Sequence, residues 1–323
     1  MDERGYILQK VAYALLTIAI VASLNFVLFR ILPGDPARLL LPRGQWETKA
    51  IAEQRAAFHL DKPLWQQFGY YWRDTLQGEF GKSFKEKRSV IEAVGQRLWP
   101  TLLLTGTGML FAIGVGVSSG ILAGWRRGRT FDTVSTGTSM VFYAMPTLWL
   151  GLIFIGLFSV RLGWFPPGRM EEPGAVYASQ WEHVQAVLHH LVLPALTFGL
   201  AYMGQYHLIM RSSITGVKNE DFVLTARAKG LSSMKVLHRH VVHNAMLPTF
   251  TLIMLNMGFV VSGAILIETV FNWPGIGLLS YHAMINRDYP VLQAVFLLAS
   301  VAVILCNLIA DVVYYYLDPR VKA

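Results

Sequence analysis

The sequence predicts an all-α, polytopic membrane protein with six transmembrane helices. Its 323 residues are 54% hydrophobic and only 15% charged, and a soluble domain of this size would carry more charge. Six runs of 19 to 28 residues contain no Asp, Glu, Lys or Arg, and a helix of about 20 apolar residues suffices to span a bilayer. The six runs are Val11–Phe29, Pro100–Gly124, Thr133–Val160, Leu191–Met210, Ala245–Ile267 and Val291–Ala310.

The first run is predicted to be a retained membrane anchor and not a signal peptide. At 19 residues it is longer than the usual apolar stretch of a signal peptide. The cluster Leu32–Pro36 that follows it contains no small-x-small cleavage site. Its two prolines and its glycine instead predict the end of the helix at the outer face.

The distribution of positive charge predicts that both termini are cytoplasmic. The short segments on one side contain 13 Lys and Arg residues, whereas the short loops on the other side contain 3. The positive-inside rule places the richer side in the cytoplasm. That side comprises segments 1–10, 126–132, 211–244 and 317–323, and the other side comprises 161–190 and 268–290. Segment 33–99 is also basic, but loops longer than about 60 residues translocate with little regard to charge.

A polar, basic segment of 28 residues, Asp221–Pro248, separates the fourth and fifth runs. Residues from Glu220 to Lys229 favour a helix, with acidic residues at its first turn and basic residues at its last. Gly230 can adopt the left-handed conformation that ends a helix. We therefore predict a short helix outside the bilayer that presents a surface to a partner. An ordinary amphipathic interfacial helix is the alternative.

This segment resembles the cytoplasmic loop of permease subunits of binding-protein-dependent ABC importers, in particular the dipeptide/oligopeptide (peptide/nickel) branch. The resemblance is carried by Thr225–Leu231 and by Asn244–Pro248. Leu224 stands where the general family pattern has Glu, and Gly230 lies 18 residues before Pro248, the longer spacing of the peptide branch. The resemblance implies the type I ABC importer permease fold and a coupling helix that docks on an ATPase. The implied docking residues are Asp221, Phe222, Thr225, Ala226, Arg227, Ala228, Lys229, Gly230 and Leu231.

A second stretch that resembles this family is Gly263–Gly277, which follows the fifth run. A Gly/Pro-rich stretch at the outer face can shape a gate or a substrate mouth. We expect Glu268 to lie near the bilayer interface, where burial of a charge costs little. In the third run, Pro146 predicts a kink in the helix. The kinked segment either lines the pore, acts as a hinge or is a static bend. The gate and pore candidates are Pro146, Glu268, Trp273, Pro274 and Gly275.

The resemblance also sets the expected domains. Residues 1–96 form an N-terminal transmembrane helix with an external segment, 97–316 form the type-1 transmembrane domain with its coupling loop at 211–248, and 317–323 form a cytoplasmic tail. The external segment contains Phe58–Phe68 and Gly78–Phe84, both similar to peptide-type permeases. Its aromatic residues suit the headgroup zone, and it either contacts an external binding protein or packs on the helix ends.

Within the second run, small residues recur every four positions at Ala112, Gly116, Gly120 and Gly124. This spacing allows another helix backbone to approach closely, either within the chain or in a second permease.

Nothing in the sequence predicts catalysis or a bound cofactor. Gly81-Lys82-Ser83 is not a phosphate-binding loop, because position 76 is Leu where that motif needs Gly. The three histidines between 238 and 243 do not have the spacing or the neighbours of a metal site, and a solvated basic helix face explains them better. The single Cys306 excludes an internal disulfide. The basic residues form no stripe typical of nucleic-acid binding.

Taken with the resemblance, these observations predict a permease subunit of an ATP-driven importer in a bacterial or archaeal inner membrane. It would pair with a homologous permease, two ABC ATPases that hold ATP and Mg, and an external binding protein. Di- or oligopeptides are the expected substrates; nickel chelates, glutathione, haem or oligosaccharides are alternatives. A stand-alone secondary transporter is the alternative from another class, but the centres of the runs carry no charges and no inverted repeat is evident. An intramembrane enzyme is a third, weaker class.

Overall fold

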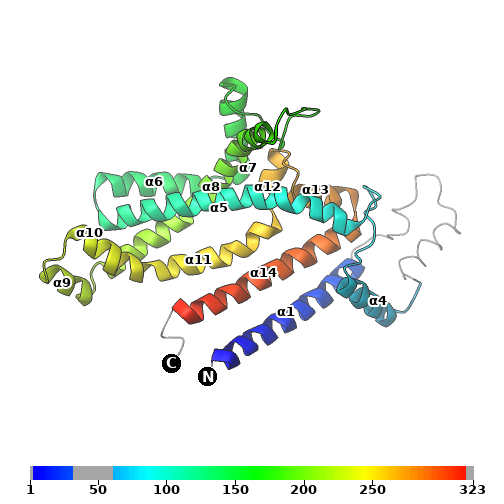
Figure 1. Ribbon diagram of the computed structural model, residues 1–323, viewed down its shortest axis with the longest axis horizontal. Helices are drawn as coiled ribbons and strands as arrows, with labels where there is room; N and C mark the ends of the chain where they lie inside the picture. The colour runs from blue at the N-terminus through cyan, green and yellow to red at the C-terminus, as the bar shows by residue number, and fades with distance from the viewer. Residues whose placement is uncertain (1–2, 32–60, 318–323) are drawn as a thin grey trace. The chain divides into compact units, whose positions relative to one another are not determined.

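The computed structural model describes residues 3–31 and 61–317. The cluster Leu32–Pro36, the start of the Phe58–Phe68 motif and residues 318–323 of the tail lie outside these ranges. The described residues are mainly helical, and their β structure is limited to one isolated bridge between Lys82 and Ser89. The chain therefore has the predicted all-α fold (Figure 1).

All six predicted apolar runs fall on helices. Among the described residues, four helices are long and apolar enough to cross a bilayer, and the bent pair Thr130–Ala144 and Thr147–Arg161 is apolar enough to form a broken span or a re-entrant loop. The four are α1 (Glu3–Ile31), α5 (Val90–Trp125), α8 (Gln180–Val217) and α14 (Tyr289–Leu317). The fifth run lies on α11 (His243–Ser262) and extends into α12 (Ile265–Val270). The shorter elements include α4 (Leu64–Gln77), α9 (Asp221–Ala228), α10 (Ser233–Val236), η2 (Leu237–Val242) and α13 (Ile276–Asn286).

The third run does not form the single helix that the sequence predicts. It divides into α6 (Thr130–Ala144), α7 (Thr147–Phe154) and the π-helical η1 (Ile155–Arg161), and the chain turns by 102° between the first two segments. Met145 is extended, with φ −74° and ψ 130°, because a residue before proline is kept out of the helical region. Pro146 then starts α7. The expected kink is a complete break.

The chain divides into two compact units, residues 100–275 and residues 1–99 with 276–323. In the first, Figure 1 shows α9 and α10 at one end of the helices α5, α6, α8 and α11, with α7 and α12 toward the other end. One apolar cluster in this unit is built around Leu104, Tyr206 and Trp273, and another joins α8 to the segment from α9 to η2.

Glycines determine how closely α5 packs on α8. A Cβ at Gly116 would lie 2.6 Å from the backbone oxygen of Met203, and a Cβ at Gly120 would lie 2.7 Å from that of His207. The corresponding distance at Gly124 is 2.8 Å. Such distances leave no room for a side chain, so this glycine stripe mediates packing within the chain.

In the other unit, α1 and α14 run side by side (Figure 1). Lys10 on α1 forms an ion pair with Asp311 on α14, with 2.9 Å between Nζ and Oδ2. Asp288 receives hydrogen bonds from the Ser83 hydroxyl at 2.6 Å and from two backbone N–H groups that follow Ser83. Asp288 thus holds the turn after Gly81 against the start of α14.

Candidate coupling surface

The polar segment begins with the short helix α9, as the sequence predicts. Asp221 lies in its first turn and Arg227 in its last, where each charge complements the helix dipole. Gly230 has φ +76°, a left-handed conformation that glycine adopts without the strain of a side chain. The chain then enters α10 and the π-helical η2 before α11 begins.

The two faces of α9 differ in character. Val223 and Ala226 are buried, and they join Met210 and Ile214 of α8 in an apolar cluster. On the opposite side of the helix, Leu224 is 55% exposed. Phe222 is 41% exposed and lies at the edge of the buried side, four residues before Ala226. The buried side fixes α9 to the end of α8, and Leu224 and Phe222 offer apolar contacts that a partner can cover.

The candidate docking residues are therefore not equivalent. Asp221, Phe222, Thr225, Arg227, Ala228, Lys229 and Gly230 are exposed, Leu231 is partly buried, and Ala226 is buried. A docking partner can reach the exposed group directly. Ala226 can act on docking only by holding the helix in place.

Two cations attach the ends of α9 to the last residue of α5. Lys218, just before α9, donates a hydrogen bond of 2.7 Å to the Trp125 carbonyl, and its Nζ lies 5.1 Å from the Trp125 ring centre. Arg227 lies over the same ring at 5.4 Å. Burial lowers the pKa of the Lys218 ammonium, and the nearby charge of Arg227 lowers it further. Trp125 thus ties α5 to both sides of the α8–α9 turn.

A polar network joins α5, α6 and α8 near this surface. Both carboxylate oxygens of Asp132 accept hydrogen bonds from the Arg211 guanidinium, at 2.5 and 2.9 Å. Asp132 also accepts the backbone N–H of Gly128 at 2.8 Å, which shapes the turn before α6. Arg211 lies on α8, so this pair joins the two helices.

His207 extends the network toward α5. It is fully buried, with Nδ1 2.9 Å from the Ser119 hydroxyl and Nε2 3.1 Å from the Thr136 hydroxyl. Thr136 in turn donates to Asp132 at 3.3 Å. Because both ring nitrogens have partners, the histidine is a satisfied structural group between three helices.

The gate candidates separate into a packed group and two exposed residues. Glu268 is fully buried, and its carboxylate accepts from the Thr101 hydroxyl at 3.1 Å and from the Ala264 N–H at 3.2 Å. Trp273 is also buried and donates to the Pro100 carbonyl at 2.8 Å. A Cβ at Gly275 would lie 2.3 Å from Glu268, so only glycine fits there.

We expected Glu268 near the bilayer interface, where burial of its charge costs little. The structure shows instead that its side chain is fully buried in the protein. Protein surrounds its side chain, and hydrogen bonds offset the cost of removing the carboxylate from water. Pro146 and Pro274 are exposed, and Pro146 lies at the break between α6 and α7.

Sequence reasoning missed the contacts of Trp125, Lys218, Asp132 and Arg211. Asp132 and Arg211 were visible as single charges at the ends of apolar runs, and opposite charges in such places often pair. The sequence gives no signal that Trp125 contacts the segment around α9, because the two are about 100 positions apart. In the part of the chain that the structure describes, no group of three His, Cys, Asp or Glu side chains is arranged to hold a metal ion.

Two family descriptions together match nearly the whole chain. Residues 116–323 match the binding-protein-dependent transport system inner membrane component. Residues 4–105 match the N-terminal part of the membrane component of such systems.

Among curated proteins, the chain is similar to the glutathione transport system permease protein GsiC. The protein from Salmonella choleraesuis is 39% identical over 318 residues, which cover 98% of this chain and 99% of the relative. The protein from Escherichia coli K12 is 38% identical with the same coverage. Among solved structures, a chain of the MetNI methionine ABC transporter in an inward-facing conformation matches with a TM-score of 0.55 and 18% identity. That match covers 71% of this chain and 97% of the other, and it shows a shared fold.

Proposed function

Because the chain belongs to the family of inner membrane components of binding-protein-dependent transport systems, which are permease subunits of ABC importers, we propose that it forms half of a translocation pathway for small peptides. The exposed face of α9 is the contact through which separate ATPase subunits drive the change of conformation. The observation that carries this proposal is the division of α9 into a side buried in the protein and an exposed side that includes the apolar residue Leu224.

The mechanism follows from how firmly α9 is attached. When two ATPases close around ATP, a surface docked on them moves with them. The buried face of α9 and the contacts of Trp125 pass this motion to α5 and α8. The pair Arg211–Asp132 extends it to α6. The membrane helices then move together and switch access from one side of the bilayer to the other.

The complete transporter would contain a second, homologous permease, two ATPases and an external binding protein. The apolar side chains that remain exposed on the membrane helices, such as Val134 and Tyr143 on α6, face lipid or that second permease. The orientation proposed from the positive charges puts α9 and both termini in the cytoplasm.

Peptides of two to a few residues are the proposed substrate class, and glutathione, a tripeptide thiol, is the first candidate. Similarity over almost the whole of the glutathione permeases supports this choice. Sequence similarity of about two residues in five leaves nickel chelates, haem and oligosaccharides as alternatives that the same architecture can serve.

The substrate assignment can be tested with the whole transporter in proteoliposomes. We expect ATP-dependent accumulation of radiolabelled glutathione that requires the binding protein. Unlabelled di- and tripeptides should compete, and nickel–histidine should not. Uptake of the nickel chelate without uptake of glutathione or peptides would contradict the assignment.

The coupling role can be tested by placing a charge on the exposed face of α9. Leu224→Lys should weaken co-purification of the ATPase subunits and reduce uptake, because the substitution puts an ammonium group into an apolar contact. The matched control is Val176→Lys, which introduces the same charge at an exposed position in the loop before α8. Equal retention of ATPase by both variants would contradict the proposed docking face.

A further inference from the structure

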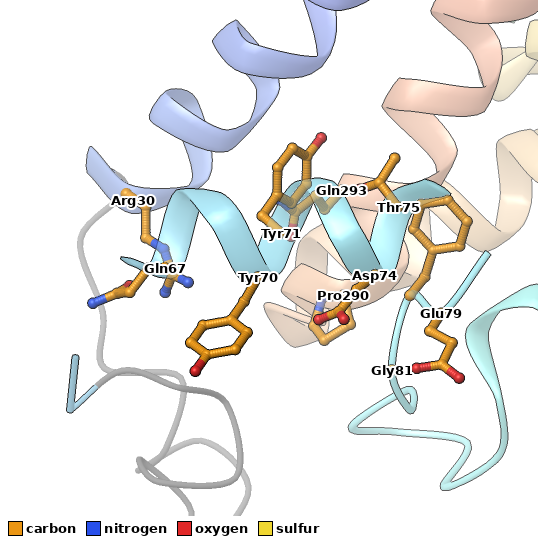
Figure 2. A pocket seen from close by; sticks show the side chains of 11 residues that line it. Arg30, Gln67, Tyr70, Tyr71, Asp74, Thr75, Glu79, Gly81, Pro290 and Gln293 are labelled. Atoms are coloured by element: carbon orange, nitrogen blue, oxygen red, sulfur yellow. The ribbon is translucent and has the colours of Figure 1, made fainter. Parts of the chain in front are cut away.

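The unit formed by the two ends of the chain contains a cavity of about 370 Å³. Its wall is made by the end of α1, the inner face of α4, the turn after α4 and the start of α14 (Figure 2). The residues that matter for its chemistry are Arg30, Gln67, Tyr70, Asp74, Glu79 and Gln293. Glu79 belongs to the Gly78–Phe84 motif, which is expected either to contact an external binding protein or to pack on the helix ends.

One end of the cavity is cationic. The Arg30 guanidinium stacks 5.3 Å from the ring centre of Phe26. Phe26 packs at 5.3 Å on Phe68 and at 5.4 Å on Tyr71, both on α4. This stack fixes the guanidinium beside α4, and Figure 2 shows Arg30 next to Gln67. Among the described residues, Arg30 has no carboxylate partner within ion-pair distance.

A buried amide beside this cation is only half satisfied. Gln67 is 6% exposed, and its Nε2 donates to the Lys62 carbonyl at 2.7 Å. Its Oε1 has no hydrogen-bond partner among the described residues. The oxygen is itself buried, so it contributes to the packing of α4 and is not exposed to a ligand in the cavity.

The other end of the cavity is anionic. Asp74 lies on α4 two turns after Gln67, and Glu79 lies in the turn that follows the helix. Figure 2 shows both carboxyl groups on the side of the cavity away from Arg30. Neither carboxylate forms an ion pair with a described Lys or Arg. The cavity therefore offers a cation and two anions, each without a protein counter-ion in the described part of the chain.

The separation of these charges indicates the size of the ligand. Gln67, beside Arg30, and Asp74 are seven residues apart on α4, and a rise of about 1.5 Å per residue puts them about 10 Å apart along the helix. An extended chain spans at most about 3.3–3.6 Å per residue, so a tripeptide covers about this distance between its ends. A zwitterionic lipid headgroup places its ammonium only two carbons from its phosphate ester, which is too short to reach both ends.

We propose that this cavity binds a zwitterionic peptide of about three residues, with its carboxylate at Arg30 and its ammonium group at Asp74 and Glu79. The inference deepens the proposed function and rests on it for the presence of small peptides at this part of the protein. It would give the permease a peptide site of its own, additional to any selection by the binding protein.

The test is equilibrium binding to the intact transporter in nanodiscs, without ATP and without the binding protein. The probes are trialanine, N-acetyl-trialanine, trialanine amide and phosphoethanolamine. Trialanine should bind, and loss of one charged end should weaken binding by about tenfold to a hundredfold, the effect of one charge-assisted hydrogen bond. Phosphoethanolamine should bind more weakly than trialanine.

Variants assign each end of the peptide. Arg30→Gln should remove the preference for a free carboxylate and retain the preference for a free amine. Asp74→Asn combined with Glu79→Gln should do the reverse. Arg73→Gln is the control, because Arg73 is exposed on α4 and does not line the cavity. A misfolded variant would lose both preferences together, so the retained preference reports a folded site.

Three results would overturn the proposal. They are absence of saturable trialanine binding, unchanged end-group preferences in the variants, and binding of phosphoethanolamine as tight as that of trialanine, which would identify a lipid headgroup site. The assay uses no uptake step. Glutathione uptake without trialanine binding would thus overturn only the proposal that the cavity binds peptides. Trialanine binding without peptide uptake would overturn only the proposed function in peptide transport.

Discussion

Two charged residues at the ends of apolar runs form ion pairs with charges on a neighbouring helix. Arg211 pairs with Asp132, and Lys10 pairs with Asp311. These pairs differ in exposure. The Asp132 side chain is 4% exposed, whereas the Asp311 side chain is 43% exposed. The energetic weight of a pair grows with burial, because the surrounding protein cannot replace a lost partner.

The pair of Asp132 and Arg211 is therefore expected to contribute strongly to stability. Asp132→Asn leaves the guanidinium without its counter-ion, and Arg211→Gln leaves a buried carboxylate. Each single change should destabilise the detergent-solubilised protein by about 3 kcal/mol. The double variant should lose much less stability than the two single variants added together, because neither charge is then left without its partner. Thermal unfolding of the three variants measures this coupling, and strictly additive losses would contradict it.

Gly230 supplies the second prediction at this scale. Its φ of +76° imposes a strain of about 1–2 kcal/mol on a side chain other than Gly or Asn. No atom lies within 4 Å of a Cβ placed there, so the strain acts on the turn and not on a packed core. Gly230→Trp should insert into the membrane normally, hydrolyse ATP in the assembled transporter and fail to drive uptake.

The control for that change is Gly230→Asn, because Asn tolerates the left-handed region. It should retain most of the coupling between hydrolysis and uptake. Wild-type uptake by Gly230→Trp would refute a role for this turn in docking.

Much of the arrangement of helices could be predicted from the sequence. The apolar runs predict the positions of α5 and α8 in the sequence. The four-residue spacing of small residues predicts that another helix packs closely on α5. The charges at the ends of α9 and the glycine after it predict that helix nearly to the residue. These features are local, since each depends on residues within a few turns.

Other features could not be predicted because they depend on contacts distant in sequence. Pro146 indicated a disturbance of the third run, but a local signal does not determine a turn of 102°. Burial of Glu268 requires Thr101, more than 160 positions away. Likewise, the burial of Ala226 depends on α8 and η2, which pack against it.

The glycine stripe gives the prediction at the scale of elements. Gly120→Ala would place a methyl group 2.7 Å from the His207 carbonyl oxygen, so α5 and α8 must separate. Overpacking of this kind costs about 1–3 kcal/mol. Gly114→Ala, on the same helix but with no atom within 4 Å of the new Cβ, should instead be neutral or stabilising by up to about 1 kcal/mol.

Thermal unfolding in one detergent compares the two glycine variants directly. Equal melting temperatures would mean that α5 and α8 do not pack at these positions.

At the scale of the whole molecule, our proposal makes the chain a permease that passes motion from separate ATPase subunits to its membrane helices. Its family is one of membrane permeases, and ATP hydrolysis is assigned by our proposal to separate subunits. The ATPase subunits would contact the exposed residues of α9 and move this helix. Trp125 and the Asp132 network join α9 to α5, α6 and α8. Movement of α9 without these helices would disrupt buried contacts on several sides at once.

The most direct test of this account is cross-linking at Phe222 in the assembled transporter. Cys306 is first replaced by Ser, so that Phe222→Cys or, as a control, Trp181→Cys supplies the single thiol in the permease. We predict that a short thiol–amine cross-linker joins position 222 to an ATPase subunit and that position 181 gives no such product. Efficient labelling of the thiol at position 222 by a soluble maleimide, without any cross-link to the ATPase, would contradict the central claim that α9 is the docking surface.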